Sequence, residues 1–388
     1  LQTIDVADVL HDCVCLEYEG GDKVYVPVEN LDVLSRYGGG DSQVNLDKLG
    51  GSSWQQRKAR VKKDLLAMAQ ELLAIAAQRQ SAIGALCDLS LPIYGEFVSR
   101  FPYEETEDQL AAIQDIESDL SSGKLLDRLI CGDVGFGKTE VALRAACLVA
   151  GAGKQVAIIV PTTLLAQQHY DNFQKRFANL GVHIGMSCRL TKPKQLKRLR
   201  EDLELGAVQV VIGTHGLLHD SIKFADLGLV IIDEEQHFGV KQKEKLKSLK
   251  KDLHVLTLTA TPIPRTLQMS LAGVKDLSII ASPPIHRLAV HTQITTIEST
   301  SIREALIREK HRQGQSFYVC PRIKDIQKIF DKLTQIVPEL TIAKAHGQMN
   351  PQELDEIMIS FYKGDIDVLL ATNIIESGLD VPRANTII

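Results

Sequence analysis

Hydrophobic and polar positions alternate in the first part of the chain. Residues 13–28 alternate on either side of Gly20-Gly21-Asp22, which is typical of a β-hairpin. Pro27 lies near the end of the second run and fits an edge strand, because proline has no N–H to offer a neighbouring strand. We therefore expect a small β module within residues 1–50.

A long helix is expected next. Ser52 and Ser53 are suitable N-caps, and the residues from Trp54 to Ala85 are mostly strong helix formers with apolar side chains at helical spacing. The first turns are basic, which is typical of a solvated helical face. We expect a helix within residues 51–90 that connects the β module to the rest of the chain.

After Pro92, apolar runs of strand length alternate with helical stretches. This alternation predicts βαβ units and parallel sheets. Pro283-Pro284 divides the series into a first α/β lobe, residues 91–282, and a second lobe, residues 283–388. The chain ends within an expected strand, so we expect the second lobe to be incomplete. The expected strands are Leu129–Cys131, Val156–Val160, Val208–Ile212, Leu229–Ile232, Val255–Leu258, Ser316–Val319, Thr341–Ala345, Val368–Leu370 and Thr386–Ile388.

Composition narrows the class of protein. With 388 residues, 44% apolar and 24% charged, the chain has the balance of a folded globular protein. A net charge of −5 excludes a nucleic-acid binder recognisable by bulk charge, so an anionic partner must meet local basic groups. No apolar run reaches the ~20 residues of a membrane span, and Leu1 opens no signal peptide. We expect a piece of a longer protein.

The seven cysteines are scattered, and no C-x-x-C occurs. An odd number without metal-binding spacing favours neither a disulfide framework nor a zinc site. We therefore expect a cytoplasmic protein.

A phosphate-binding loop is the strongest motif. The string GDVGFGKT follows an expected strand and opens a helix, which is the context that G-x-x-x-x-G-K-[ST] requires. Its backbone N–H groups and the helix N-terminus suit phosphate oxygens, Lys138 suits the β- and γ-phosphates, and the Thr139 hydroxyl suits Mg²⁺. The expected ATP-contacting residues here are Gly132, Asp133, Val134, Gly135, Phe136, Gly137, Lys138, Thr139 and Glu140.

An acidic pair ends another expected strand. Asp233 and Glu234 follow Leu229–Ile232, and ligands bind at the carboxyl ends of parallel strands. We expect Asp233 to hold the Mg²⁺ through its water shell and Glu234 to act as the base for the attacking water. Gln236 and His237 follow, and either could sense the γ-phosphate.

Small hydroxyl residues follow three more expected strands, at Thr162-Thr163, Thr214 and Thr259. Such groups suit a nucleic-acid phosphate backbone. Taken singly, each is better explained by ordinary helix capping. Helix capping does not explain why these residues follow in this order around one phosphate loop.

In this order the motifs resemble those of superfamily 2 helicases and translocases. The resemblance implies RecA-like lobes, ATP with Mg²⁺, adenine recognition by Phe101 and Gln109, and catalysis by Lys138, Asp233 and Glu234. It also implies DNA contacts in the first lobe and a further motif at 371–380. The DNA-contacting candidates are Thr162, Thr214, His215 and Arg265.

Longer strings are similar to those of the bacterial transcription-repair coupling factors. They include CGDVGFGKTEVALRAA and DEEQHFGVKQKEKLK. The family implies a double-stranded DNA translocase that displaces stalled RNA polymerase. The β module would bind the polymerase β subunit, and regions outside this chain would meet excision-repair proteins. Arginine fingers lie beyond residue 388 in the family, so we expect weak hydrolysis from this piece alone. Gln236-His237 departs from the His-Arg often found there.

Two alternatives stay open. Branched-DNA helicases of the RecG type have similar motor strings but carry an oligonucleotide-binding domain in front of the motor. The chain could also be a polymerase-binding module with an inactive motor. ATP hydrolysis with and without duplex DNA would separate an active motor from an inactive one.

Overall fold

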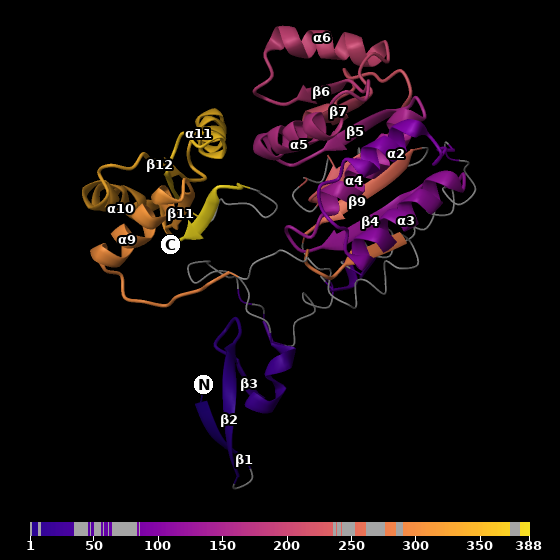
Figure 1. Ribbon diagram of the computed structural model, residues 1–388. Helices are drawn as coiled ribbons and strands as arrows, with labels where there is room; N and C mark the ends of the chain where they lie inside the picture. Colours follow the sequence, from indigo (N-terminus) through magenta and orange to yellow (C-terminus); the bar gives the residue numbers. More distant parts are fainter. Residues whose placement is uncertain are drawn as a thin grey trace. The chain divides into compact units, whose positions relative to one another are not determined.

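The computed structural model describes residues 2–6, 9–34, 46, 48–49, 56, 58–60, 62–63, 84, 86–235, 238, 242, 253–260, 276–284, 290–372 and 381–388. The chain forms two compact units, Leu1–Ile75 and Ala76–Ile388. Figure 1 labels their helices and strands. None of the helices in these described ranges is long and apolar enough to cross a membrane.

The first unit is built on a three-stranded antiparallel sheet. The expected hairpin is confirmed as β2 (Val9–Glu17) and β3 (Lys23–Pro27), and β1 (Gln2–Val6) adds a strand that the pattern did not predict. The turn has φ of +93° at Gly20 and +87° at Gly21, which glycine adopts without strain. With the order β1-β2-β3, β3 is an edge strand, as Pro27 indicated, and η1 (Val28–Val33) follows it.

The expected connecting helix falls largely outside the described residues. Residues 56, 58–60 and 62–63 are helical, and their side chains are exposed. This agrees with a solvated basic face over the first turns. The rest of the range from Trp54 to Ala85 is not described apart from Gly84, which is not helical.

A seven-stranded, wholly parallel sheet forms the first lobe of the second unit, which confirms the α/β prediction. Its strand order is β10-β4-β9-β8-β5-β7-β6. The elements are α2 (Pro92–Ser99), α3 (Glu107–Ser121), β4 (Asp127–Gly132), α4 (Lys138–Gly151), β5 (Gln155–Ile159), α5 (Thr163–Arg176), β6 (Ile184–Ser187), α6 (Pro193–Glu204), β7 (Val210–Gly213), η2 (His215–Leu218), β8 (Leu227–Asp233), β9 (His254–Thr259) and β10 (Asp276–Ile280).

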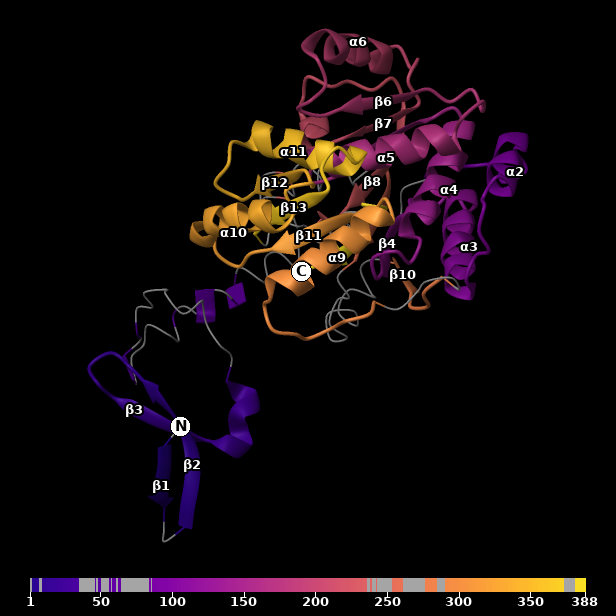
Figure 2. The ribbon, with the colours of Figure 1, turned by 60° about the vertical axis from the view of Figure 1, so that its left-hand side comes forward.

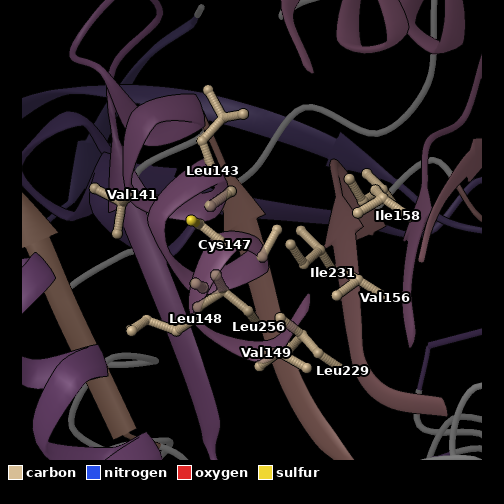
Figure 3. Packing of buried hydrophobic residues seen from close by; sticks show 14 of the residues in the cluster. Val141, Leu143, Cys147, Leu148, Val149, Val156, Ile158, Leu229, Ile231 and Leu256 are labelled. Carbon is tan, nitrogen blue, oxygen red and sulfur yellow. The ribbon is translucent and has the colours of Figure 1, made fainter. Parts of the chain in front are cut away.

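Buried side chains cover both faces of this sheet. Along β5, Val156 and Ile158 belong to one hydrophobic cluster, whereas Ala157 and Ile159 belong to the other. Figure 3 shows side chains of α4, including Leu148, over the β5, β8 and β9 residues of the first cluster. Strands buried on both faces read as continuous apolar runs, which is why five of them were predicted from the sequence.

The strands β6 and β10 were missed, and both lie at sheet edges. Side chains of β6 are alternately half-buried and buried, and Gly185 interrupts its pattern. In β10, Asp276 and Ile279 are exposed. An edge strand buries less apolar surface, so its sequence carries a weaker signal.

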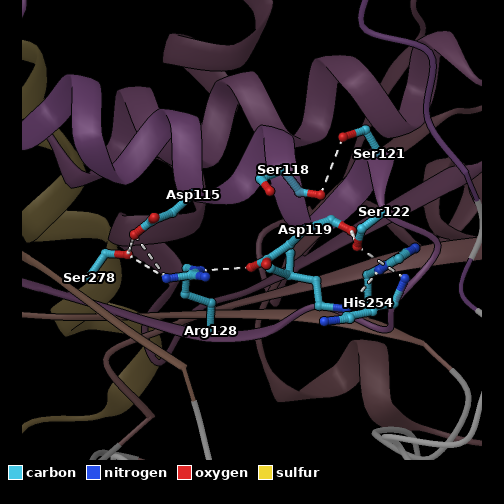
Figure 4. A network of polar contacts seen from close by, with 10 residues as sticks. Asp115, Ser118, Asp119, Ser121, Ser122, Arg128, His254 and Ser278 are labelled. Atoms are coloured by element: carbon cyan, nitrogen blue, oxygen red, sulfur yellow. Dashed lines mark hydrogen bonds and ion pairs between the residues drawn. The ribbon is translucent and has the colours of Figure 1, made fainter.

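Helix α3 is fixed to the sheet by a polar network that Figure 4 shows. Arg128 of β4 donates to Asp115 at 2.9 Å, to Asp119 at 2.8 Å and to Ser278 of β10 at 2.9 Å. Ser278 in turn donates to Asp115 at 2.6 Å. Because the guanidinium is buried, these partners compensate its lost hydration.

The second lobe repeats the strand order of the first. Its parallel sheet runs β12-β13-β11-β14, which corresponds to β6-β7-β5-β8. Figure 2 shows the helices α9, α10 and α11 around these strands. The elements are α9 (Ser299–His311), β11 (Gln315–Val319), α10 (Ile323–Ile336), β12 (Ile342–Ala345), α11 (Pro351–Lys363), β13 (Val368–Ala371) and β14 (Ala384–Ile387). All four strands expected here are confirmed.

Two glutamines mark the same position in the two lobes. Gln155 opens β5 and donates its side-chain amide to Leu203 O at 3.0 Å and Val208 O at 2.8 Å. Gln315 opens β11 and donates to Phe361 O and Ile366 O, both at 2.6 Å. Each amide thus joins the last turns of one helix to the segment just before the next strand. The two lobes share this feature as well as the strand order of a RecA-like fold.

Candidate nucleotide-binding site

The site lies at the carboxyl ends of three neighbouring strands. In the sheet order, β9 stands between β4 and β8. The phosphate loop follows β4, Asp233 ends β8, and Thr259 ends β9. Parallel strands therefore bring together three motifs that are far apart in the sequence, at the edge where open α/β sheets bind ligands.

Glycines shape the phosphate loop. Gly135 has φ +80°, and Gly137, the N-cap of α4, has φ +85°. A Cβ on Gly137 would lie 2.4 Å from Nε2 of Gln109. The loop therefore excludes a side chain at Gly137 both by backbone conformation and by contact.

Gln109 supports this loop from α3. Its side chain accepts from Thr106 N at 3.0 Å, while Gln109 N donates to Thr106 Oγ1 at 3.3 Å, which forms a capping box. Its amide also donates to Phe136 O at 2.8 Å. Gln109 thus joins the start of α3 to the phosphate loop, and its role toward adenine stays a prediction.

Lys138 folds back onto the loop that carries it. Its ammonium donates to Gly132 O at 2.7 Å and to Asp133 O at 2.9 Å. Burial lowers the pKa of Lys138, while the negative charges of Asp233, Glu234 and Asp133 act in the opposite direction. Among the described residues, this half-buried cation donates to carbonyls of its own loop, and an anionic ligand can take the place of such neutral acceptors.

Glu234 occupies an unusual backbone conformation. Its φ is +52°, in the left-handed region that non-glycine residues rarely adopt, and its side chain is 1% exposed. Ala260 N donates to its Oε1 at 2.9 Å, and Glu234 N donates to Leu258 O at 3.0 Å. These bonds fix the carboxylate between β8 and β9 and maintain a strain of the kind found at functional sites.

Asp233 has a partner that the sequence did not reveal. His169 of α5 lies with Nε2 2.9 Å from Asp233 Oδ2, and both side chains are buried. A signal was present, since His169 stands between Leu165 and Phe173 at spacings of four residues, within the buried stripe of the helix. A polar residue in an apolar stripe needs a partner, but the stripe alone does not say which.

Phe101 and Glu140 belong to an ion-pair network beside the loop. Glu140 accepts from Arg144 at 3.2 Å and from Arg176 at 2.8 Å, and Arg144 also pairs with Glu105. The guanidinium carbons of Arg144 and Arg176 lie 5.6 and 5.5 Å from the centre of the Phe101 ring. The network fixes the start of α4 and the ring together. The nucleotide contacts of Phe101 and Glu140 remain predictions.

The predicted DNA contacts are placed only in part. Thr162 is the N-cap of α5, accepting from Leu165 N at 3.3 Å, so the capping explanation holds for its side chain. Thr214 precedes η2 and makes no side-chain cap there, and His215 is exposed. Arg265 lies outside the described residues, as do Gln236, His237 and residues 373–380 of the last motif.

The residues present fit a nucleotide with its metal. Among the described residues, no group of three or more His, Cys, Asp or Glu side chains could hold a metal ion. Mg²⁺ in nucleotide sites is usually held by only one or two protein groups together with substrate phosphates. Thr139, half-buried in the first turn of α4, and Asp233 are such groups. Lys138 supplies the matching positive charge.

Three family models match the chain. They are the CarD-like/TRCF RID domain over residues 1–38, the DEAD/DEAH box helicase over residues 106–270 and the Helicase conserved C-terminal domain over residues 298–388. The first covers the β sheet, and the other two cover parts of the two lobes.

Curated relatives match along the whole chain. The transcription-repair-coupling factor of Rickettsia conorii is 51% identical over 392 residues, covering 100% of this chain and 35% of the relative. That of Bacillus subtilis is 45% identical over 389 residues, covering 100% of this chain and 33% of the relative. The chain thus spans about a third of the length of these relatives.

Solved structures share the fold. RecG bound to a three-way DNA junction has 33% identity and a TM-score of 0.67, covering 86% of this chain and 45% of that one. Dbp5 of S. cerevisiae, bound to RNA and ADP BeF3, has 17% identity and a TM-score of 0.55, covering 76% of this chain and 78% of that one. The second likeness shows the fold alone. With the three domain matches and about half of its residues identical to relatives throughout, the chain belongs to the transcription-repair-coupling factor family.

Proposed function

We propose that this chain is the polymerase-binding and motor part of an ATP-dependent double-stranded DNA translocase that displaces stalled RNA polymerase. The observation that carries the proposal is the meeting of Lys138, Asp233 and Glu234 at one sheet edge, in a chain similar to transcription-repair-coupling factors throughout. Each of these groups has the chemistry that phosphoryl transfer to water requires.

Each residue of the site has a separate role in this proposal. Lys138 turns from its own carbonyls to the β- and γ-phosphates and neutralises their charge. Thr139 and Asp233 would hold a magnesium ion, which would shield charge on the phosphates. Glu234, held by Ala260 N, orients the attacking water and accepts its proton. The bond to Ala260 joins this base to the segment after β9, so a shift of that segment would move the base.

Single-turnover hydrolysis of ATP with and without duplex DNA tests the motor. This measurement detects slow chemistry, which matters because the expectation of weak hydrolysis by this piece stands as a prediction. We expect Mg²⁺-dependent hydrolysis that Glu234→Gln removes. A rate that Glu234→Gln leaves unchanged would exclude Glu234 as the base, and no Mg²⁺-dependent hydrolysis by the wild type would favour an inactive motor.

The partner of the β module is proposed to be the β subunit of RNA polymerase. Strand β3 is an edge of its sheet, and Tyr25 on it is 41% exposed. An exposed edge offers unpaired backbone groups to a strand of another protein. Contacts with excision-repair proteins are proposed for other regions of the longer protein.

A branched-DNA helicase remains the second candidate, because RecG shares 33% identity over most of the chain. The match of residues 1–38 to the CarD-like/TRCF RID domain favours the translocase. Binding to a three-way junction in strong preference to plain duplex DNA would favour the helicase instead.

A further inference from the structure

We propose that His169 is the positioning residue for Asp233, and that it holds this carboxylate ready for the magnesium ion of bound ATP. The inference rests on the proposed function of the site and adds to it a side chain from another helix. His169 lies on α5, whereas Asp233 ends β8, 64 residues later.

The contact is short and enclosed. His169 Nε2 lies 2.9 Å from Asp233 Oδ2, and the two residues are 6% and 9% exposed. In so little water a hydrogen bond to a carboxylate is stronger than at the surface. The contact at Oδ2 orients the carboxylate, and a metal ion or its water shell would then meet a carboxylate whose position is already fixed.

The other ring nitrogen indicates which tautomer is present. His169 Nδ1 is buried, and no hydrogen-bond partner for it is found among the described residues. A proton there would be a buried donor without an acceptor, which is costly. We therefore place a ring proton on Nε2, from which the imidazole donates to the carboxylate of Asp233.

The helix that carries His169 also begins at a predicted DNA contact. Thr162 caps α5, and His169 follows seven residues later, about two helical turns along. Helix α5 thus extends from its cap, Thr162, to the side chain that contacts the Asp233 carboxylate. Through His169, a displacement of α5 on DNA binding would reach Asp233 directly.

Three variants separate positioning from simple packing. In glutamine, Nε2 is as many bonds from Cα as in histidine, so His169→Gln can still donate to Asp233. In His169→Asn the amide is one bond shorter and loses the contact. His254→Asn is the matched control, because His254 is also buried in this lobe. It lies at the amino end of β9, away from the site, and its Nδ1 accepts from Leu126 N at 3.0 Å.

The measurement is the affinity of the chain for ATP by calorimetry, once with Mg²⁺ and once with EDTA. Loss of a residue that orients a metal ligand typically costs 10–100-fold in metal affinity or activity. We expect His169→Asn to weaken binding of Mg–ATP about tenfold and to leave metal-free ATP binding unchanged. His169→Gln should restore most of the affinity, and His254→Asn should match the wild type in both conditions.

Each failure has its own pattern. Suppose that the wild type binds Mg–ATP and that Lys138→Ala loses this binding. If His169→Asn then binds Mg–ATP as tightly as the wild type, His169 has no positioning role. Equal losses with and without Mg²⁺ would show a packing role and also overturn the proposal. If the wild type binds no ATP in either condition, the proposed function itself falls.

A measurement on the wild type covers the case in which His169→Asn fails to fold. The Nε2–H signal of His169 in a ¹⁵N-labelled chain, assigned with His169→Gln, should shift when Mg²⁺ is added to the ATP complex. A signal that does not respond to Mg²⁺ would overturn the proposal.

Discussion

Glycine 137 of the phosphate loop is a position at which an added side chain meets two obstacles. It combines φ +85° with a Cβ position 2.4 Å from Gln109, whose amide is held by Phe136 O. Alanine would therefore have to accept left-handed backbone and also displace a hydrogen-bonded side chain. Gly153 has nearly the same backbone, with φ +80°, but nothing lies within 4 Å of its Cβ position.

Gly137 and Gly153 are therefore expected to respond differently to the same substitution. Gly153→Ala should cost about 1–2 kcal/mol of stability from backbone strain alone and leave ATP affinity unchanged. Gly137→Ala should cost more and weaken ATP binding at least tenfold, because the loop and Gln109 move apart. Thermal melts and calorimetry on both variants check this, and equal melts with equal affinities would contradict it.

Single residues also show where prediction from sequence stopped. Lys138, Asp233 and Glu234 could be proposed from the sequence because each belongs to a short motif at the end of an expected strand. His169 could not be assigned a role, since its partner lies 64 residues away and depends on how α5 packs. The pairing of Glu140 with Arg176 was equally hidden, because it depends on how two helices pack against each other.

At the scale of elements, each lobe has a glutamine at the first residue of the corresponding strand, Gln155 in β5 and Gln315 in β11. Gln155 and Gln315 each donate to two backbone carbonyls in the interior, and both are 3% exposed. Buried carbonyls that lose their donors cost free energy. The amides therefore stabilise the junction between the helix and the strand that lie beside them.

We expect Gln155→Leu and Gln315→Leu each to reduce the free energy of unfolding by about 1–3 kcal/mol, since Val208 O or Ile366 O loses a donor in the interior. The other carbonyl of each pair, Leu203 O or Phe361 O, keeps a backbone donor. Hydrogen exchange should then locate the loss to the lobe that carries the substitution. A loss spread evenly over both lobes would contradict the view that each lobe contains its own copy of this junction.

In the first lobe, the strands buried on both faces were predictable, whereas the two edge strands were not. The interior strands β4, β5, β7, β8 and β9 read as apolar runs, while the edge strands β6 and β10 did not. The limits of the domains along the chain remain predictions, as does most of the connecting helix.

At the scale of the whole molecule, the chain forms two compact units that we assign to two tasks. Tyr25→Ala should weaken capture of RNA polymerase at least fivefold and leave ATP affinity unchanged. Lys138→Ala should do the reverse. Leu205→Ala, at a residue that is 79% exposed in the second unit, is the surface control. Loss of polymerase binding in Lys138→Ala, or none in Tyr25→Ala, would contradict this division.

The central claim is that Lys138, Asp233 and Glu234 form a working ATP site. Equilibrium binding of Mg–ATP to the wild type, Lys138→Ala and Glu234→Gln tests it most directly. Lys138→Ala removes a cation that faces the phosphates, so its binding should fall at least 100-fold. Glu234→Gln removes the base but keeps an oxygen that can accept from Ala260 N, so its binding should stay within about threefold of the wild type. Unchanged binding in Lys138→Ala, or an equal collapse in both variants, would contradict the account.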